Sequence, residues 1–128
     1  SNNNISSGKL EPKVFSSLTN LEVLHLDGNN LENLEDPEIF AENQKLTDLQ
    51  LSKNQIQTLN SSIFNFNSNL KNLKNLFLNH NNITELDASI FKNLSNIERI
   101  WLHDNPDLNH LDKEIFKNNK MSPLTRFL

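Results

Sequence analysis

Two histidines and an aspartate in the second half of the chain have the side chains that metal binding or acid–base chemistry requires. His80 and Asp104 occupy equivalent positions of a repeating pattern, and His103 directly precedes Asp104. Imidazole and carboxylate groups bind zinc and related ions. Consecutive residues after a strand, however, are expected to point their side chains apart, which would leave any such site open and shallow. We therefore predict no metal site and no cofactor.

Histidine is enriched on one expected face of the protein, at His25, His80 and His103. Because imidazole titrates near neutral pH, this pattern raises the hypothesis of a pH-sensitive contact. Solvated surface histidines account for the same pattern and are the simpler interpretation.

No catalytic set is predicted. Serine, histidine and aspartate are present, but the chain has no nucleophile-elbow motif. His80 and Asp104 would pair as a base and its orienting group. The candidate nucleophile Ser52, however, falls in the preceding repeat and at a different position of the repeat, so it is not expected to lie next to His80. The chain has no cysteine, which excludes thiolate catalysis, disulfides and cysteine-type zinc sites. We therefore predict that the protein is not an enzyme.

A repeat positions all of these side chains. Its unit reads LxxLxLxxNxLxxL and ends in a phenylalanine, and successive units begin 25, 27 and 24 residues apart. We expect one domain over 1–128, in which a partial unit at 1–20 and a partial unit or cap at 121–128 flank the complete units. The complete units are residues 21–45, 46–72, 73–96 and 97–120.

Each unit predicts one coil of a solenoid. The LxL segment alternates as a short strand does, and strands of neighbouring units would pair in parallel about 4.8 Å apart. One asparagine per unit would bond backbone groups of its own and the adjacent coil, giving a ladder of Asn29, Asn54, Asn81 and Asn105. The phenylalanines would form a spine of Phe15, Phe40, Phe64, Phe91 and Phe116.

Turns in this solenoid need residues that tolerate a positive φ, and the chain has only two glycines. Asparagine tolerates that conformation better than most residues. We therefore expect Asn29-Asn30 and Asn81-Asn82 to take over part of the role of glycine. The segments opposite the strands, such as 35–38 and 65–71, are expected to be turns or short helical pieces.

The pattern resembles the leucine-rich repeat family. The period and the late phenylalanine are similar to its typical class, as in Toll-like receptor ectodomains and secreted insect immune proteins. The resemblance covers nearly the whole chain and implies an α/β solenoid, a right-handed coil with a parallel β-sheet on its concave face. It also implies recognition of a protein ligand through that sheet, in an extracellular, innate-immune setting. The chain lacks the cysteine-rich caps that extracellular members usually carry.

An aromatic pair is the best candidate for a binding anchor on the expected sheet. Phe77 and Trp101 are equivalent residues of adjacent units, so their side chains should be neighbours on an otherwise polar face. Exposed aromatic pairs are typical anchors at protein interfaces. The alternative is that the two rings simply stack on each other or lie beneath an adjacent segment. The expected rim consists of Gln50, Asn79, Arg99 and His103.

Four N-x-S/T sequons begin at Asn4, Asn60, Asn82 and Asn93. The asparagine-rich composition produces about this number by chance, so the sequons do not establish secretion. If the chain is glycosylated, Asn60 and Asn93 are the expected acceptors, because they fall outside the strands. Asn82 is expected to be less accessible beside the ladder residue Asn81.

Charge and hydropathy exclude two classes of partner. The formal net charge is −4 and no dense stripe of basic residues occurs, so nucleic acid is not expected to bind. No stretch of 18 apolar residues occurs, so membrane insertion is not expected. A solenoid exposes its core at an uncapped end. We interpret such ends as those of a fragment of a longer array, with weak self-association as the second explanation and a cap formed by the final residues as the third. The alternative function is therefore a structural or assembly segment that oligomerises, or continues a longer array, through its ends.

Overall fold

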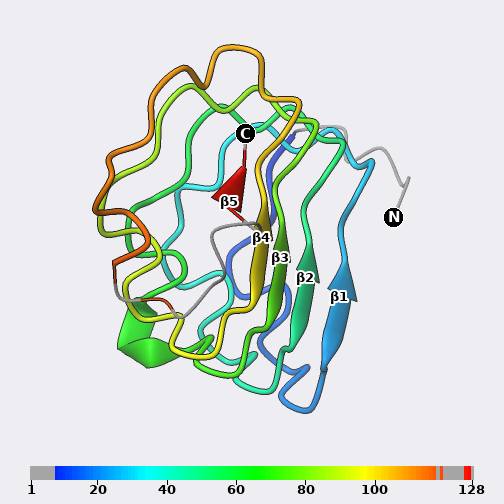
Figure 1. Cartoon of the computed structure of the whole chain (residues 1–128). Helices are drawn as coiled ribbons and strands as arrows, with labels where there is room; N and C mark the ends of the chain where they lie inside the picture. The colour runs from blue at the N-terminus through cyan, green and yellow to red at the C-terminus, as the bar shows by residue number, and fades with distance from the viewer. Residues whose placement is uncertain (1–7, 118, 120–125, 128) are drawn as a thin grey trace.

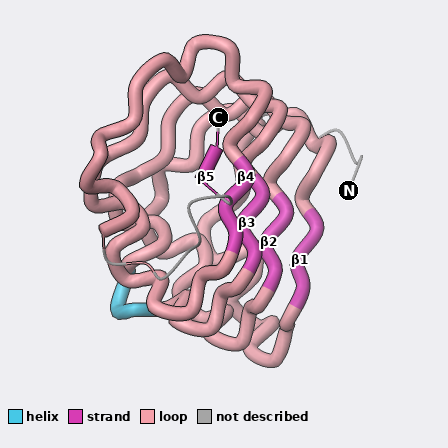
Figure 2. Tube along the Cα trace, viewed as in Figure 1, coloured by secondary structure: helices cyan, strands magenta, loops and turns pink. Residues whose placement is uncertain are grey.

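In a computed structural model, residues 8–117, 119 and 126–127 are described, and they form a stack of similar coils with strands along one side (Figure 1). Loops and turns make up most of the remaining path of each coil (Figure 2). The expected solenoid with a parallel sheet is confirmed. The sequon at Asn4 and the apolar residues Met121 and Leu124 lie outside the described residues.

Five short strands of the described chain form one parallel sheet, in sequence order. Their central residues are in register, with Leu24 opposite Leu49, Leu49 opposite Leu76, and Leu76 opposite Ile100. The last strand pairs Trp101 with Phe127. The strands are β1 (Val23–His25), β2 (Asp48–Gln50), β3 (Asn75–Phe77), β4 (Arg99–Trp101) and β5 (Arg126–Phe127).

The core fills the inside of the coils. The inward leucines and isoleucines of the repeat are buried, and the central residue of each strand from β1 to β4 is among them. On the far side, the predicted phenylalanine spine is present, with parallel rings 6.0 Å apart for Phe15 and Phe40 and 5.9 Å apart for Phe91 and Phe116. Each coil therefore buries its apolar face against its neighbours, as in other repeat proteins.

The predicted asparagine ladder is also confirmed. The Nδ2 group of Asn54 donates hydrogen bonds to the main-chain oxygens of Leu26, Leu51 and Ser52, at 3.0 to 3.1 Å. Its Oδ1 atom accepts from the N–H groups of Asn29 and Leu31 in the preceding coil. Asn81 and Asn105 repeat this arrangement in the following coils. One buried amide thus satisfies backbone groups of two coils.

The left-handed backbone positions differ from those expected. Asn30 has a positive φ, whereas Asn29, Asn81 and Asn82 do not, so the prediction was wrong for these three. The chain instead reverses one residue earlier, which leaves the ladder asparagine free to direct its amide into the core. The positive-φ residues directly before the ladder asparagines are Gly28 (69°), Lys53 (57°), His80 (58°) and Asp104 (58°).

Two further polar rows organise the segments opposite the sheet, and neither was predicted. In the first, asparagine Nδ2 groups donate to the main-chain oxygen of a spine phenylalanine in the preceding coil, from Asn43 to Phe15, Asn69 to Phe40, and Asn119 to Phe91. In the second, a side-chain oxygen accepts the N–H two residues later and so caps a turn. The capping residues are Asp36, Asn60, Asp87 and Asp112.

The turn and short-helix prediction for segments 35–38 and 65–71 is confirmed. The second segment contains the 3-10 helix η1 (Phe66–Ser68), in which Asn67 and Ser68 have positive φ values. Among the described residues, no helix has both the length and the hydrophobicity that a membrane crossing requires.

We expect Asn81→Ala to lower the free energy of unfolding by about 3 kcal/mol, because it leaves buried backbone groups of two coils unsatisfied. The side chain of Asn81 bonds the main-chain oxygens of Leu51 and Leu78 and the N–H of Ile56. Urea unfolding followed by circular dichroism measures the change. Asn82→Ala is the matched control, since Asn82 is exposed, and should change stability by at most about 0.5 kcal/mol. Equal losses in the two variants would contradict the ladder's role.

We expect Ser89→Ala to raise the pKa of Asp87. The Ser89 hydroxyl and N–H donate to Asp87 Oδ1 at 2.6 and 2.8 Å, and these bonds hold the Asp87 pKa below its usual value. Because the pKa is lower in the folded chain, the ionised carboxylate stabilises the fold above its unfolded pKa, and this contribution is lost as pH falls through the folded pKa. A carboxyl-carbon NMR titration measures the shift, with the exposed Ser95→Ala as control. An unchanged Asp87 pKa in Ser89→Ala would disprove the assignment.

Candidate recognition surface on the strand face

The outward residues of the strands form a continuous row, as their period of two predicts. In each of β1 to β4 the central residue is buried while its two neighbours are exposed or half-buried. Ser52 lies two residues after Gln50 and would continue the outward row, but it is the exception. It is buried, and its hydroxyl donates to Gln50 Oε1 at 3.2 Å. The small serine therefore supports the rim residue Gln50 and is not itself presented to a partner.

Phe77 and Trp101 are neighbours on this face, as predicted. Strand register places them opposite each other, and their rings stack with centroids 4.0 Å apart and an angle of 5° between the planes. Both side chains are half-buried. Mutual stacking, which the sequence left open as an alternative, is therefore present and covers part of each ring. The remaining surface of the two half-buried rings is an apolar patch next to Gln50 of β2.

Polar groups lie on the β2 side of the aromatic pair and near the strand ends, whereas on the other side Phe127 of β5 is opposite Trp101 in the register. Gln50 is opposite Phe77 in the register, and Arg99 is an exposed residue of β4. Asn79 and His103 are half-buried and follow β3 and β4, at the ends nearest the asparagine ladder. At the other ends of the strands, Asn75 Nδ2 of β3 donates a hydrogen bond to Asp48 Oδ2 of β2 at 3.1 Å.

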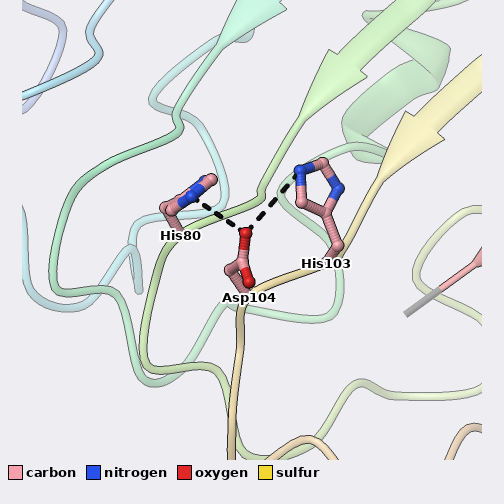
Figure 3. A group of neighbouring side chains, drawn as sticks. All are labelled: His80, His103 and Asp104. Atoms are coloured by element: carbon pink, nitrogen blue, oxygen red, sulfur yellow. Dashed lines mark ion pairs between the residues drawn. The ribbon is translucent and has the colours of Figure 1, made fainter.

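His80, His103 and Asp104 converge, contrary to the divergence expected for consecutive residues. The Nε2 atom of His80 lies 2.9 Å from Asp104 Oδ2, and the Nε2 atom of His103 lies 3.9 Å from the same oxygen. Figure 3 shows the two imidazoles on either side of one carboxylate. The backbone explains this, because a positive φ at Asp104 breaks the strand alternation directly after His103.

The sequons do not have the expected order of accessibility. Asn82 is exposed, whereas Asn60 and Asn93 are half-buried. The amide of Asn60 donates to the main-chain oxygen of Glu35 at 3.0 Å and accepts from Ser62, and the amide of Asn93 lies 3.4 Å from the oxygen of Asn65. The prediction that Asn82 is the less accessible residue was wrong. The capping role of Asn60 had no signal apart from its place at the start of a turn.

Residues 2–125 match the family described as BspA type leucine rich repeat region, in six copies. No curated protein sequence matches the chain. A chain in the solved structure of the Toll–Spatzle complex of Drosophila is similar, with a TM-score of 0.68 and 24% sequence identity. The match covers 84% of this chain and 17% of that one.

Proposed function

The chain belongs to the BspA-type leucine-rich repeat family, and from this premise we propose that it recognises a protein ligand through the outward face of its sheet. Leucine-rich repeat proteins are typically interaction modules, and the fold of this chain is similar to that of a chain in the Toll–Spatzle complex. The proposal rests on one observation, the stacked pair Phe77 and Trp101 on the outward face of the sheet. It assigns the protein no catalytic activity.

The geometry of the pair suits an anchor. Aromatic rings supply a large apolar contact with few rotatable bonds, so little conformational entropy is lost on binding. Stacking of Phe77 on Trp101 restricts both rings before a partner arrives. Residues Gln50, Asn79, Arg99 and His103 surround the rings with hydrogen-bonding and charged groups, and such a polar rim excludes water from an apolar centre.

The proposed setting is extracellular and innate-immune. It draws support from the similar chain in the Toll–Spatzle complex, which is described as a molecular hub in Drosophila development and innate immunity. This chain spans 17% of the length of that one, so partners of the longer protein transfer only as part of the proposal. In a secretory pathway Asn82 is the proposed main glycan acceptor, since its side chain is the most exposed of the three described sequon asparagines.

We expect Phe77→Ala/Trp101→Ala to weaken binding of a captured protein by about 2 kcal/mol or more, which is roughly 30-fold in Kd. The immobilised parent chain is exposed to extracellular fluid of its source organism, and captured proteins are identified by mass spectrometry. Affinities are then measured by surface plasmon resonance. Far-UV circular dichroism checks that the variant is folded.

The control is Glu85→Ala/Lys92→Ala, which changes two exposed side chains that lie outside the strands. A partner that the parent and the control retain and the Phe77/Trp101 variant loses would support recognition on the sheet. Equal binding by the parent and the aromatic variant would refute the anchor.

Assembly through the first coil is the second candidate function, and one observation favours it. Three large apolar side chains of the described residues are exposed. Val14 and Leu18 belong to the partial unit at 1–20, and Val23 begins β1 of the next unit. An exposed apolar edge of a repeat stack is suited to packing against another coil.

We expect the weight-average mass of the parent to rise with concentration if this assembly occurs, because the first coil can then bury its apolar edge. Leu18→Asp should abolish the rise, since it places a charge in that contact. Sedimentation equilibrium measures both. A mass that stays monomeric in the parent, or a rise that Leu18→Asp leaves unchanged, would count against assembly.

A further inference from the structure

We propose that His80, His103 and Asp104 form a binding site for a divalent transition-metal ion, with Zn²⁺ as the ion that best suits these ligands. One atom from each residue is available, and the three atoms lie within 4.8 Å of one another. The site would lie at the end of the strand face, beside the proposed aromatic anchor, and it does not depend on protein recognition.

Two of the three separations between the ligand atoms are within about 0.5 Å of the value that a tetrahedral ion needs, and all three are at most 4.8 Å. Zinc binds nitrogen and oxygen at about 2.0 to 2.2 Å, so two ligand atoms of a tetrahedral site lie roughly 3.4 Å apart. The two nitrogen–oxygen separations are 2.9 Å for His80 and 3.9 Å for His103, one shorter and one longer than this value. The rings themselves lie edge to face, with centroids 5.5 Å apart. Binding of one ion would require side-chain rotations that bring the His103 nitrogen closer to the other two ligand atoms.

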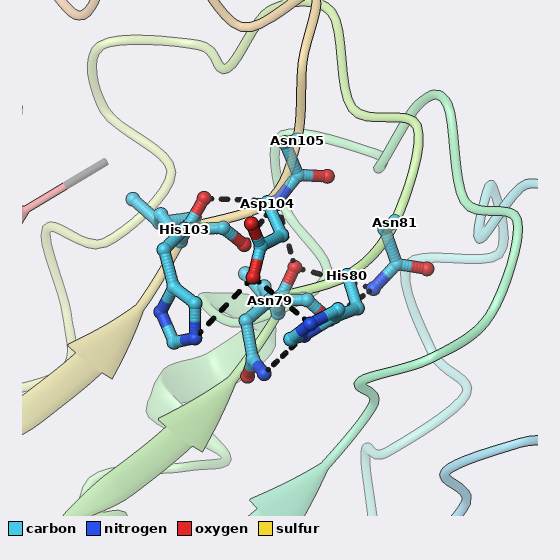
Figure 4. A network of polar contacts seen from close by, with 8 residues as sticks. Asn79, His80, Asn81, His103, Asp104 and Asn105 are labelled. Carbon is cyan, nitrogen blue, oxygen red and sulfur yellow. Dashed lines mark hydrogen bonds and ion pairs between the residues drawn. The ribbon is translucent and has the colours of Figure 1, made fainter.

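The backbone that carries the ligands is fixed by hydrogen bonds. The N–H of His80 donates to the main-chain oxygen of His103 at 3.0 Å, which ties the two turns together. Ladder residues hold the same segments, because Asn81 donates to the oxygen of Asn79 and Asn105 to the oxygen of His103. Figure 4 shows the ladder asparagines and the three proposed ligands in one network. A metal site needs such support to avoid the entropy cost of ordering its ligands.

Asn79 is placed to orient His80. Its Nδ2 atom lies 3.0 Å from His80 Nδ1. Its Oδ1 atom is buried and has no hydrogen-bond partner among the described residues. When Nε2 of His80 binds a metal, Nδ1 carries the proton and requires an acceptor. Rotation of the Asn79 amide would present Oδ1 as that acceptor, since the two amide orientations are nearly equivalent in shape. We therefore assign Asn79 as a positioning residue.

Transition metals fit this set better than magnesium or calcium do. Two imidazoles and one carboxylate favour zinc, copper or nickel, whereas magnesium and calcium require oxygen ligands. The side chains of His80, His103 and Asp104 are 46%, 34% and 58% exposed, so remaining coordination positions are open to water. His25 and Asp27 pair at 3.6 Å on the same face, but they supply a single imidazole.

Isothermal titration of the full chain with Zn²⁺ tests the proposal. We expect one ion per chain, and about tenfold or greater loss of affinity in His80→Asn, His103→Gln and Asp104→Asn. Asparagine tolerates the positive φ at positions 80 and 104, so these variants should remain folded, as circular dichroism will show. Titration with Co²⁺ provides a second readout, because its visible absorption bands report nitrogen and oxygen ligation directly.

His25→Asn is the matched control, because it removes one imidazole beside an aspartate on the same face. Unchanged affinity in this control together with the losses above would establish the site. Absence of Zn²⁺ binding by the parent would overturn the proposal. So would equal losses in His25→Asn and His80→Asn, since binding would then be spread over surface histidines. Loss of affinity in Asn79→Ala with the Co²⁺ spectrum retained would further support a positioning role for Asn79.

Discussion

The buried asparagine amide at the end of each strand is the constraint on which the structure depends. The chain turns sharply there, and its N–H and C=O groups lie away from water, so each must find a partner inside the protein. Asn54 supplies bonds to oxygens of its own coil and of the preceding one, and accepts two N–H groups from that coil. This sharing fixes the height and rotation of one coil against the next. The parallel register, the buried leucines and the outward row of the sheet all follow from it.

The repeat spacing was sufficient to predict the parts of the fold that depend on residue type alone. Leucines at alternating positions can be buried only on one side of a short strand, so the register of Leu24, Leu49 and Leu76 followed from the pattern. The same register brings Phe77 opposite Trp101, and their stacking required no information beyond it. The phenylalanine spine was predicted in the same way. Its members are large apolar residues at a nearly constant number of positions after each strand in the sequence.

Features that depend on backbone torsion, and the polar rows opposite the sheet, were not predictable. The left-handed residue before each ladder asparagine is a glycine, a lysine, a histidine and an aspartate in the four coils, so no residue type marks it. This torsion also aims Asp104 toward His103, and the sequence pattern predicted the opposite. The asparagines that bond the spine phenylalanines could not be recognised in the sequence, because asparagine is common throughout the chain. In the structure, Asn43 and Asn69 differ from the solvated asparagines because they are buried and donate to phenylalanine main-chain oxygens.

Coils of unequal length share one regular sheet, with aligned residues 25, 27 and 24 positions apart along β1 to β4. The longest of these coils contains η1, where two residues with positive φ fold the surplus chain outward. The number of residues in the segment opposite the sheet can therefore differ between coils while the strands stay in register. An insertion or a deletion at η1 would alter the outer contour and leave the strand face in alignment. Such a segment is suited to the grafting of a loop.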